Sequence, residues 1–167
     1  SLMPQSQDYK KIYDNNQGLN TGGMGSHAPV CILDDDELEF VKNNMLKVVR
    51  KLDYRGILYA GIMKTKDNIF FLEFNCRLGD PEAQVLLTLL DNQKSDLYSI
   101  CISCLNGSPI NAKWRSGYAS NIVLSHTDYP VSKSTEDLPM IIDFDGLKKK
   151  NIDLYWSNIT VKNNQYF

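Results

Sequence analysis

The sequence has no apolar run near the ~20 residues that cross a membrane, and it has only four cysteines in 167 residues. Its first residues lack the charged segment followed by an apolar stretch that marks a secretory signal. The cysteines are too few and too irregularly spaced to frame a chain of this size with disulfides. These absences together predict a cytoplasmic protein without a membrane partner.

A large excess of either charge is also absent. The chain has 18 Lys and Arg residues against 20 Asp and Glu residues, a net charge of −2, which argues against a nucleic-acid partner. A local basic pocket for a small anionic metabolite would not be visible in that sum. The content of 43% hydrophobic and 23% charged residues fits one ordinary domain, or one domain plus part of another.

The spacing of apolar residues predicts three helices. In the first, Asp34 can cap the helix, Glu37 can reach back in a capping box, and apolar residues continue at helical spacing to about Leu52. The second follows a turn and begins with a proline, and the third ends before an Asn-Gly pair. The predicted helices cover residues 34–52, 81–90 and 96–105.

Strands are predicted in both parts of the chain, which makes the fold class α+β. They cover residues 57–63, 69–75, 118–125, 140–144 and 153–161. The first two are joined by a short polar turn and form a hairpin. Because the later strands follow one another without intervening helices, we expect a helix-bearing part over residues 1–112 and a β-rich part over residues 113–167.

The second strand of this hairpin carries the strongest candidate site. Alternation with period two puts Glu73 and Asn75 on one face, with their Cα atoms about 6.6 Å apart. A carboxylate and an amide carbonyl at this separation can converge on one cation. Ligation by oxygen alone suits Mg²⁺ or Mn²⁺, which keep water or phosphate in their remaining positions. The same alternation predicts that Phe70, Leu72 and Phe74 face the core.

The turn after this strand predicts an anion site. Asp80 can cap a helix that begins at Pro81, and a helix N-terminus favours anions. Arg77 lies between the strand and the helix, and its forked donors suit a carboxylate or phosphate oxygen. In the simpler alternative, Glu73 is an exposed strand residue, Asn75 ends the strand and Arg77 is a solvated turn cation. The full string LEFNCRLGDPEAQ is far more specific than Glu-x-Asn alone.

A glycine cluster near the N-terminus forms a second motif. Its members are Thr21, Gly22, Gly23, Met24 and Gly25. Three glycines in four positions either let backbone amides approach a ligand closely or allow tight turns that residues with a Cβ resist. Because no strand precedes the cluster and no helix directly follows it, this is not the usual phosphate-binding loop. Composition leaves both a ligand site and a plain loop open.

Two regions together carry a resemblance to a known family. They are QDYKKIYDNNQGLNTGGMGSHAPV at residues 7–30, and GILYAGIM followed by FLEFNCRLGDPEAQVLL within residues 56–87. The chain resembles the phosphoribosylamine–glycine ligases, also called glycinamide ribonucleotide synthetases, which are ATP-grasp enzymes of purine biosynthesis. The similarity is specific over about residues 5–97 and weaker through the β-rich part.

The resemblance implies an ATP-dependent ligase that joins glycine to phosphoribosylamine, through a glycyl phosphate that the amine attacks. It assigns Glu73 and Asn75 to a Mg²⁺ or Mn²⁺ ion that bridges the ATP phosphates. Arg77 would hold a carboxylate or phosphate oxygen near that centre. These three residues are the most specific part of the implied site.

Further site residues follow from the same resemblance. Asp8, Lys10 and Lys11 are candidates for binding phosphate or acyl phosphate. The loop at residues 21–25, together with Asp80, would shape the pocket for glycine and phosphoribosylamine.

The resemblance also implies the second half of an ATP-grasp fold, an antiparallel sheet with helices, followed by an incomplete β-rich C-terminal domain. The segments that clasp adenine lie earlier in relatives, so the missing N-terminal half of the same polypeptide is the expected partner and the chain alone is expected to be inactive. Two alternatives stay open: another ATP-grasp carboxylate–amine ligase, or a non-catalytic scaffolding segment of a multifunctional protein.

Departures from the family pattern limit the transfer of roles. Many relatives have His where Tyr9 stands and Pro where Leu19 stands, so roles tied to those side chains are not carried over. Around Gly61 there is no second metal-binding carboxylate of the kind that many other ATP-grasp enzymes have. We therefore expect one well-held metal ion.

Overall fold

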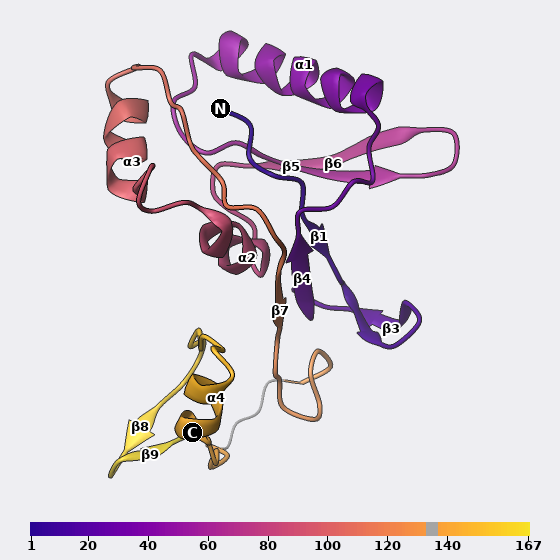
Figure 1. The fold of residues 1–167 in the computed structure, drawn as a ribbon. Helices are drawn as coiled ribbons and strands as arrows, with labels where there is room; N and C mark the ends of the chain where they lie inside the picture. Colours follow the sequence, from indigo (N-terminus) through magenta and orange to yellow (C-terminus); the bar gives the residue numbers. More distant parts are fainter. Residues whose placement is uncertain (133–136) are drawn as a thin grey trace. The chain divides into compact units, whose positions relative to one another are not determined.

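The computed structural model describes residues 1–132 and 137–167, which form two compact units, residues 1–124 and 125–167 (Figure 1). None of the helices in these described ranges is long and apolar enough to cross a membrane. The elements are helices and small antiparallel sheets, so the α+β class predicted from the sequence is confirmed.

A three-stranded antiparallel sheet lies at the centre of the first unit. It consists of β1 (Gln7–Asp8), β4 (Gly25–Ala28) and β7 (Ala119–Ile122), in the order β1-β4-β7. In the register, Ser26 of β4 is paired with Asn121 of β7. β7 confirms the strand predicted within residues 118–125, and its pairing joins segments that are far apart in the sequence.

Helix α2 (Glu82–Leu89) packs against this sheet and forms the core. Val85, Leu86 and Leu89 are buried against Ala28 of β4. Full burial of a side chain such as Val85 is worth about 1.5–3 kcal/mol. This packing fixes the start of α2 close to the glycine-rich loop that leads into β4.

The start of α2 differs from the prediction. The helix begins after Pro81, which makes no side-chain capping hydrogen bond. The carboxylate of Asp80 instead accepts a hydrogen bond from Nε2 of Gln84 at 2.9 Å. The prediction that Asp80 caps this helix is therefore wrong, because the helix starts one residue later than expected and the Asp80 side chain is bonded to the next turn.

The predicted hairpin is formed by β5 (Tyr59–Lys64) and β6 (Ile69–Asn75). Gly61 is paired with Glu73 while Ile62 is paired with Phe71, so the register shifts between them. The residue between the two partners on β6, Leu72, is the extra residue of a β-bulge. The hairpin thus keeps the predicted pairing but not a regular alternation of faces.

The bulge changes which side chains share a face. The Phe71 and Phe74 rings stack with centroids 5.5 Å apart, and Phe71 lies 6.2 Å from Phe40. Phe70, Leu72 and Phe74 are 50%, 60% and 40% exposed. The prediction that these three residues face the core is wrong, because the bulge interrupts the alternation on which it depended.

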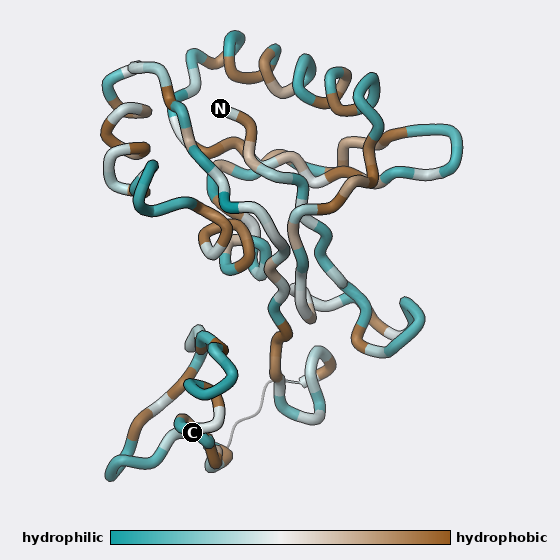
Figure 2. Tube along the Cα trace, in the orientation of Figure 1, coloured by the Kyte–Doolittle hydropathy of each residue, from teal (hydrophilic) through white to brown (hydrophobic). Residues whose placement is uncertain are grey.

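Helix α1 (Asp35–Leu52) runs beside the hairpin, and polar and apolar residues alternate around its turns (Figures 1 and 2). The predicted capping box is confirmed: the Glu37 amide donates to Asp34 Oδ1 and the Asp34 amide donates to Glu37 Oε2, both at 2.9 Å. Glu37 Oε2 also pairs with Lys64 Nζ at 2.5 Å. This pair ties the helix to the end of β5.

Three further elements complete the first unit. They are the hairpin of β2 (Lys11–Tyr13) and β3 (Gln17–Asn20), and helix α3 (Leu97–Leu105). α3 confirms the helix predicted for residues 96–105, and Asp96 caps it by accepting from the Ser99 amide at 2.9 Å. The β2–β3 hairpin was not predicted from the sequence.

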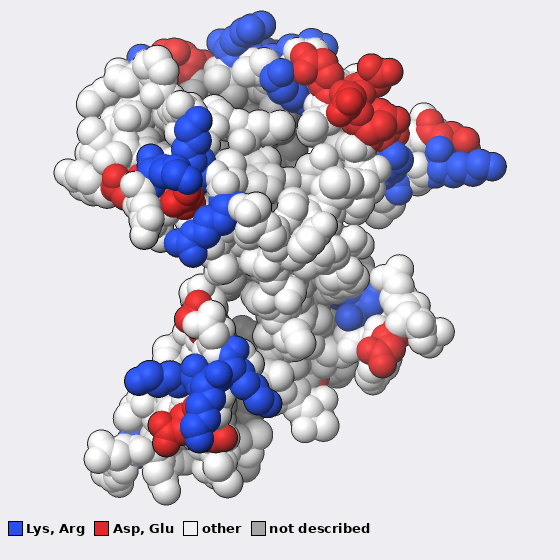
Figure 3. Space-filling model, viewed as in Figure 1, with Lys and Arg blue, Asp and Glu red and all other residues white. Residues whose placement is uncertain are grey.

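In the described part of the second unit, residues 125–132 and 137–167, there is a short helix and a short hairpin. These are α4 (Phe144–Lys149), β8 (Val161–Lys162) and β9 (Gln165–Tyr166). The rings of Trp156 and Tyr166 stack with centroids 5.2 Å apart, and Phe144 lies 5.6 Å from Tyr166. On the face drawn in Figure 3, basic side chains gather over this unit, where α4 ends in Lys148 and Lys149.

Two strand predictions in this unit are wrong. Residues 140–144 contain a single bridge between Met140 and Tyr166, and the chain then turns into α4. Asp143 caps that helix by accepting from the Gly146 amide at 2.9 Å. Only the last residue of the range 153–161 is in a strand. Phe144 and Trp156, which suggested strands, instead pack with Tyr166 in an aromatic cluster.

Candidate functional site

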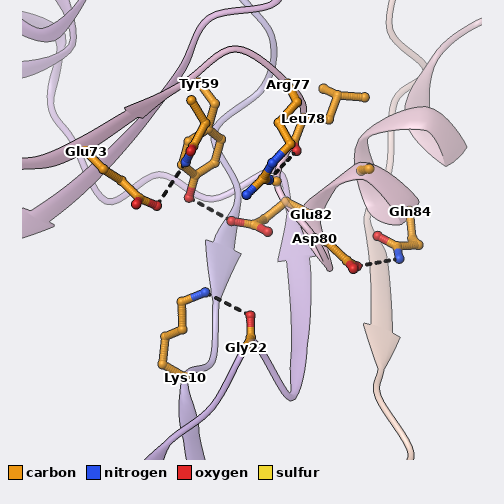
Figure 4. A pocket seen from close by; sticks show the side chains of 12 residues that line it. Lys10, Gly22, Tyr59, Glu73, Arg77, Leu78, Asp80, Glu82 and Gln84 are labelled. Atoms are coloured by element: carbon orange, nitrogen blue, oxygen red, sulfur yellow. Dashed lines mark hydrogen bonds between the residues drawn. The ribbon is translucent and has the colours of Figure 1, made fainter. Parts of the chain in front are cut away.

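A cavity of about 560 Å³ lies in the first unit, between the β5–β6 hairpin, the turn before α2 and the segment around β1 (Figure 4). This volume is within the usual range for small-molecule sites. The lining residues are Lys10, Gly22, Tyr59, Glu73, Asn75, Arg77, Leu78, Gly79, Asp80, Glu82, Ala83 and Gln84. Six of the residues predicted for the site therefore meet at one cavity, namely Lys10, Gly22, Glu73, Asn75, Arg77 and Asp80.

The side chains of Glu73 and Asn75 point to one another from the same side of β6. Asn75 Nδ2 donates a hydrogen bond to Glu73 Oε1 at 2.9 Å, so the prediction that they share a face is confirmed. Gly61 is the residue opposite Glu73, and a Cβ there would lie only 3.0 Å from Glu73 Cγ. The glycine thus leaves room for the Glu73 side chain to lie across β5.

The donor set of this pair fits a hard divalent cation. Two neighbouring ligands of an octahedral Mg²⁺ ion, each at about 2.0–2.1 Å, are about 3 Å apart. The observed separation is 2.9 Å, and rotating the Asn75 amide by half a turn would place its oxygen, in place of nitrogen, beside the carboxylate. Within residues 1–132 and 137–167 no cluster of three or more His, Cys, Asp or Glu side chains has metal-binding geometry. Such an ion would therefore take its other ligands from water or phosphate.

Two cations reach the cavity from different elements. Arg77 donates through Nη1 to the carbonyl of Leu78 at 2.9 Å, which holds the guanidinium beside the turn before α2. Lys10 donates to the carbonyl of Gly22 at 3.0 Å and forms an ion pair with Asp8. Fixed cations on both sides of a polar cavity can hold the oxygen atoms of a phosphate group.

Tyr59 and Glu82 also line the cavity, although neither was predicted from the sequence as a site residue. The Tyr59 hydroxyl donates to Glu82 Oε1 at 2.8 Å. Burial raises the pKa of Tyr59, and the hydrogen bond to Glu82 and the charges of Glu82, Asp8 and Glu73 raise it further. The only sequence signal was the place of Glu82 within the GDPEAQ string. Nothing in the sequence indicated that Tyr59, 23 positions earlier, is the hydrogen-bond partner of Glu82.

Two glycines of the glycine-rich loop lie in close contact with other segments of the same chain. Gly23 has a φ of +137°, and a Cβ there would lie 2.4 Å from Pro81 Cδ and 2.9 Å from Asp8 Oδ1. Gly25 has a φ of +154°, and a Cβ there would lie 2.6 Å from the Asn121 carbonyl oxygen. These two glycines are needed for close packing between the loop, the start of α2 and β7.

The remaining predicted residues lie around this loop. Thr21 donates through its hydroxyl to the Lys10 carbonyl at 2.8 Å, and the Met24 amide donates to the carbonyl of Tyr9. Lys11 donates to the Gly18 carbonyl at 3.1 Å and is not among the residues that line the cavity. The Asp8 side chain is 9% exposed and forms its ion pair with Lys10.

Comparison with known proteins gives related matches. The family model described as phosphoribosylglycinamide synthetase, ATP-grasp (A) domain, matches residues 1–83. A trifunctional purine biosynthetic protein adenosine-3 from Chironomus tentans is 37% identical over 98% of this chain, and a phosphoribosylamine–glycine ligase from a Nostoc species is 38% identical over 77% of it. The crystal structure of phosphoribosylamine–glycine ligase from Thermotoga maritima matches 98% of the chain with a TM-score of 0.70 and 29% identity.

In each of these matches, the chain corresponds to a part of the relative. It spans 12% of the Chironomus protein, 32% of the Nostoc protein and 40% of the Thermotoga chain. The similarity therefore concerns a segment of each relative and not its whole length.

Proposed function

We propose that this chain, which resembles a fragment of phosphoribosylamine–glycine ligase, supplies one wall of the active site of an ATP-dependent ligase. The enzyme would join glycine to 5-phosphoribosylamine and release ADP and phosphate, in purine biosynthesis. The observation that carries the proposal is the 2.9 Å approach of the Glu73 and Asn75 side chains at a cavity that also holds Arg77. A carboxylate, an amide and a guanidinium in one polar cavity suit a metal-bound phosphate.

In this proposal Glu73 and Asn75 would hold Mg²⁺ or Mn²⁺. Such an ion would supply charge neutralisation at the γ-phosphoryl group. Arg77 and Lys10 hold phosphate oxygens from two sides, which orients the group for attack by the glycine carboxylate. The resulting glycyl phosphate is then attacked by the amine of phosphoribosylamine.

Other predicted residues take supporting roles in the proposal. Asp8 pairs with Lys10 and directs its ammonium group, and Asp80 and Gly22 shape the edge of the cavity. The Thr21–Gly25 loop, through its contacts with Asp8 and Pro81, sets the distance between Lys10 and the start of α2. Lys11 would act on a phosphate only from outside the cavity described above.

The proposal extends to the domain structure. Residues 1–112 would be the second half of an ATP-grasp domain, and residues 113–167 the start of an incomplete β-rich C-terminal domain, with residues 113–124 packed in the first compact unit. The rest of the nucleotide pocket would come from the N-terminal half of the same polypeptide. The chain alone would then be inactive, and its setting would be the cytoplasm.

The test is a comparison of glycine-dependent ADP release by the purified chain and by the intact polypeptide that carries it. We expect no turnover from the chain alone and normal enzymatic turnover from the intact polypeptide, with phosphoribosylamine required as the amine. Turnover of the isolated chain at a normal rate would contradict the division of the active site. Preference for another acid or another amine would contradict the assigned reaction.

A further inference from the structure

Tyr59 and Glu82 connect two walls of the cavity. Tyr59 is on β5, directly opposite Asn75 of β6, and its hydroxyl donates to Oε1 of Glu82 at 2.8 Å. Glu82 is the first residue of α2 and is 3% exposed. One hydrogen bond thus joins the hairpin that carries Glu73 to the helix that follows the Arg77 turn (Figure 4).

The Tyr59 ring also borders the space of the Glu73 side chain. A Cβ on Gly61 would lie 3.0 Å from Glu73 Cγ and 3.4 Å from Tyr59 Cε1, so both side chains lie over this glycine. Glu73 is itself exposed, and an exposed carboxylate on a flexible stem has several rotamers to choose from. A fixed ring on one side reduces that choice.

The turn before α2 leaves room for the Glu82 carboxylate. A Cβ on Gly79 would lie 2.5 Å from Glu82 Oε2, so the absence of a side chain there makes room for the carboxylate. None of the ion pairs among the described residues involves Glu82. Because a buried carboxylate is costly without a partner, its charge-assisted hydrogen bond with the Tyr59 hydroxyl is favoured strongly.

We infer that Tyr59 and Glu82 are positioning residues for the Glu73–Asn75 pair, an inference that rests on the metal site of the proposed function. Their hydrogen bond fixes the Tyr59 ring, and the ring borders the space over Gly61 that the Glu73 side chain occupies, which limits the positions open to the Glu73 carboxylate. Loss of an outer-shell partner of a metal site lowers metal affinity by about 10–100-fold. We expect the Tyr59→Phe variant, which keeps the ring and loses the hydroxyl, to bind Mn²⁺ about tenfold more weakly.

The experiment is a titration of free Mn²⁺, followed by electron paramagnetic resonance, in the intact polypeptide with and without a non-hydrolysable ATP analogue. The variants are Tyr59→Phe, Glu82→Gln and Glu73→Gln, with Tyr98→Phe as the matched control because Tyr98 is 75% exposed on α3. Glu82→Gln keeps an oxygen that accepts from the Tyr59 hydroxyl, so it should weaken Mn²⁺ binding less than Tyr59→Phe does. Thermal unfolding of each variant separates loss of affinity from loss of fold.

The outcomes distinguish a failure of the proposed metal site from a failure of the positioning role alone. Unchanged Mn²⁺ binding in Glu73→Gln, or no binding by the wild type, overturns the metal site itself. Weakened binding in Glu73→Gln with wild-type affinity in Tyr59→Phe overturns only the positioning role, as does a lower melting temperature of Tyr59→Phe with unchanged affinity. A larger loss of Mn²⁺ affinity in Glu82→Gln than in Tyr59→Phe would overturn the positioning role, because it would mean that the charge of Glu82 acts on the metal and the position of the Tyr59 ring does not.

Discussion

The two motif segments of this chain differ in what surrounds their unusual residues. Around Gly23 and Gly25 there is protein: Pro81 on one side and the backbone of β7 on the other. Around Glu73 and Arg77 there is a cavity, and among the described residues their side chains form hydrogen bonds with Asn75 and Leu78, which are neighbours along the chain. The first segment therefore packs against protein, and the second lines the cavity where we propose that a ligand binds.

This difference shows that a motif can carry a resemblance to a family through its packing as much as through its chemistry. A glycine-rich loop is easily assigned to ligand binding, because glycine allows close approach of any atom. Here the atoms that approach Gly23 belong to Asp8 and Pro81. If the comparison is right, substitutions in the two segments should have separable effects, on activity in one segment and on stability in the other.

The largest effect is expected for Glu73→Gln in the intact polypeptide. Loss of the carboxylate removes the charged ligand of the proposed metal site, and kcat should fall at least about 100-fold, while the melting temperature changes little. Glycine-dependent ADP release is the measurement. Glu39→Gln, on the exposed face of α1, is the control. A kcat near that of the wild type would contradict the proposed functional role of the segment around Glu73.

The next effect is on stability and concerns Gly23→Ala. The new Cβ would overlap Pro81 Cδ at 2.4 Å in a backbone with φ +137°, and we expect a loss of about 3 kcal/mol in the free energy of unfolding. Urea unfolding measures it. Gly117→Ala is a matched control, since Gly117 has φ +114° and nothing within 4 Å of a Cβ, so it should lose only about 1 kcal/mol.

Equal losses in these two variants would mean that backbone strain alone matters and that the close contact with Pro81 does not. A stable Gly23→Ala protein that lost activity would instead return the loop to a ligand-binding role.

A smaller loss is expected for Asn121→Ala on β7. Its Oδ1 accepts from the Ser26 amide at 2.8 Å and from the Ser26 hydroxyl at 3.1 Å, and Ser26 is buried. Leaving the Ser26 amide without this acceptor should cost about 1–3 kcal/mol, measured by urea unfolding. Asn43→Ala, which removes an exposed hydrogen bond to Glu39 on α1, should cost less than about 0.5 kcal/mol. Equal values for the two variants would contradict the packing role of the segment that leads into β4.

How far the sequence predicts this structure depends on how local each signal is. The α1 capping box uses residues three positions apart, and it was predicted correctly. The proximity of Glu73 and Asn75 on one strand is equally local, and it is confirmed. Signals of this kind are complete within one turn or one strand, so no tertiary contact is needed to read them.

The failures have tertiary or competing causes. The bulge at Leu72 depends on the pairing with β5, which alternation along β6 alone does not reveal. Asp80 had a better partner in Gln84 than the amides it was expected to cap. The bond between Tyr59 and Glu82 joins two elements whose packing is set elsewhere, by the core of α2. A composition rich in aromatic residues suggested strands near Trp156, where the rings pack into a cluster instead.

The smallest effect is expected outside both segments, at the pair that ties the hairpin to α1. The hydrogen bond from Lys64 lowers the pKa of Glu37 below its usual 4.5, and the Asp34 amide lowers it further. A lowered pKa gives stability that is present above about pH 4.5 and is lost as the pH falls through the folded-state pKa. The melting temperature of Glu37→Gln should therefore lie slightly below that of the wild type at pH 7, and the difference should vanish at low pH.

Gln keeps the hydrogen bond of the capping box, so the comparison isolates the charge. Asp36→Asn, at an exposed carboxylate of the same helical turn, is the control and should show a smaller difference at pH 7. A loss of stability in Glu37→Gln as large as that in Gly23→Ala would mean that the Glu37–Lys64 ion pair is a major source of stability. The contrast between a packed segment and an open site would then not account for the stability of this unit. A small change in melting temperature is expected because an ion pair that water screens contributes little to stability. It would mean that the contacts between the glycine-rich loop, α2 and β7 contribute more.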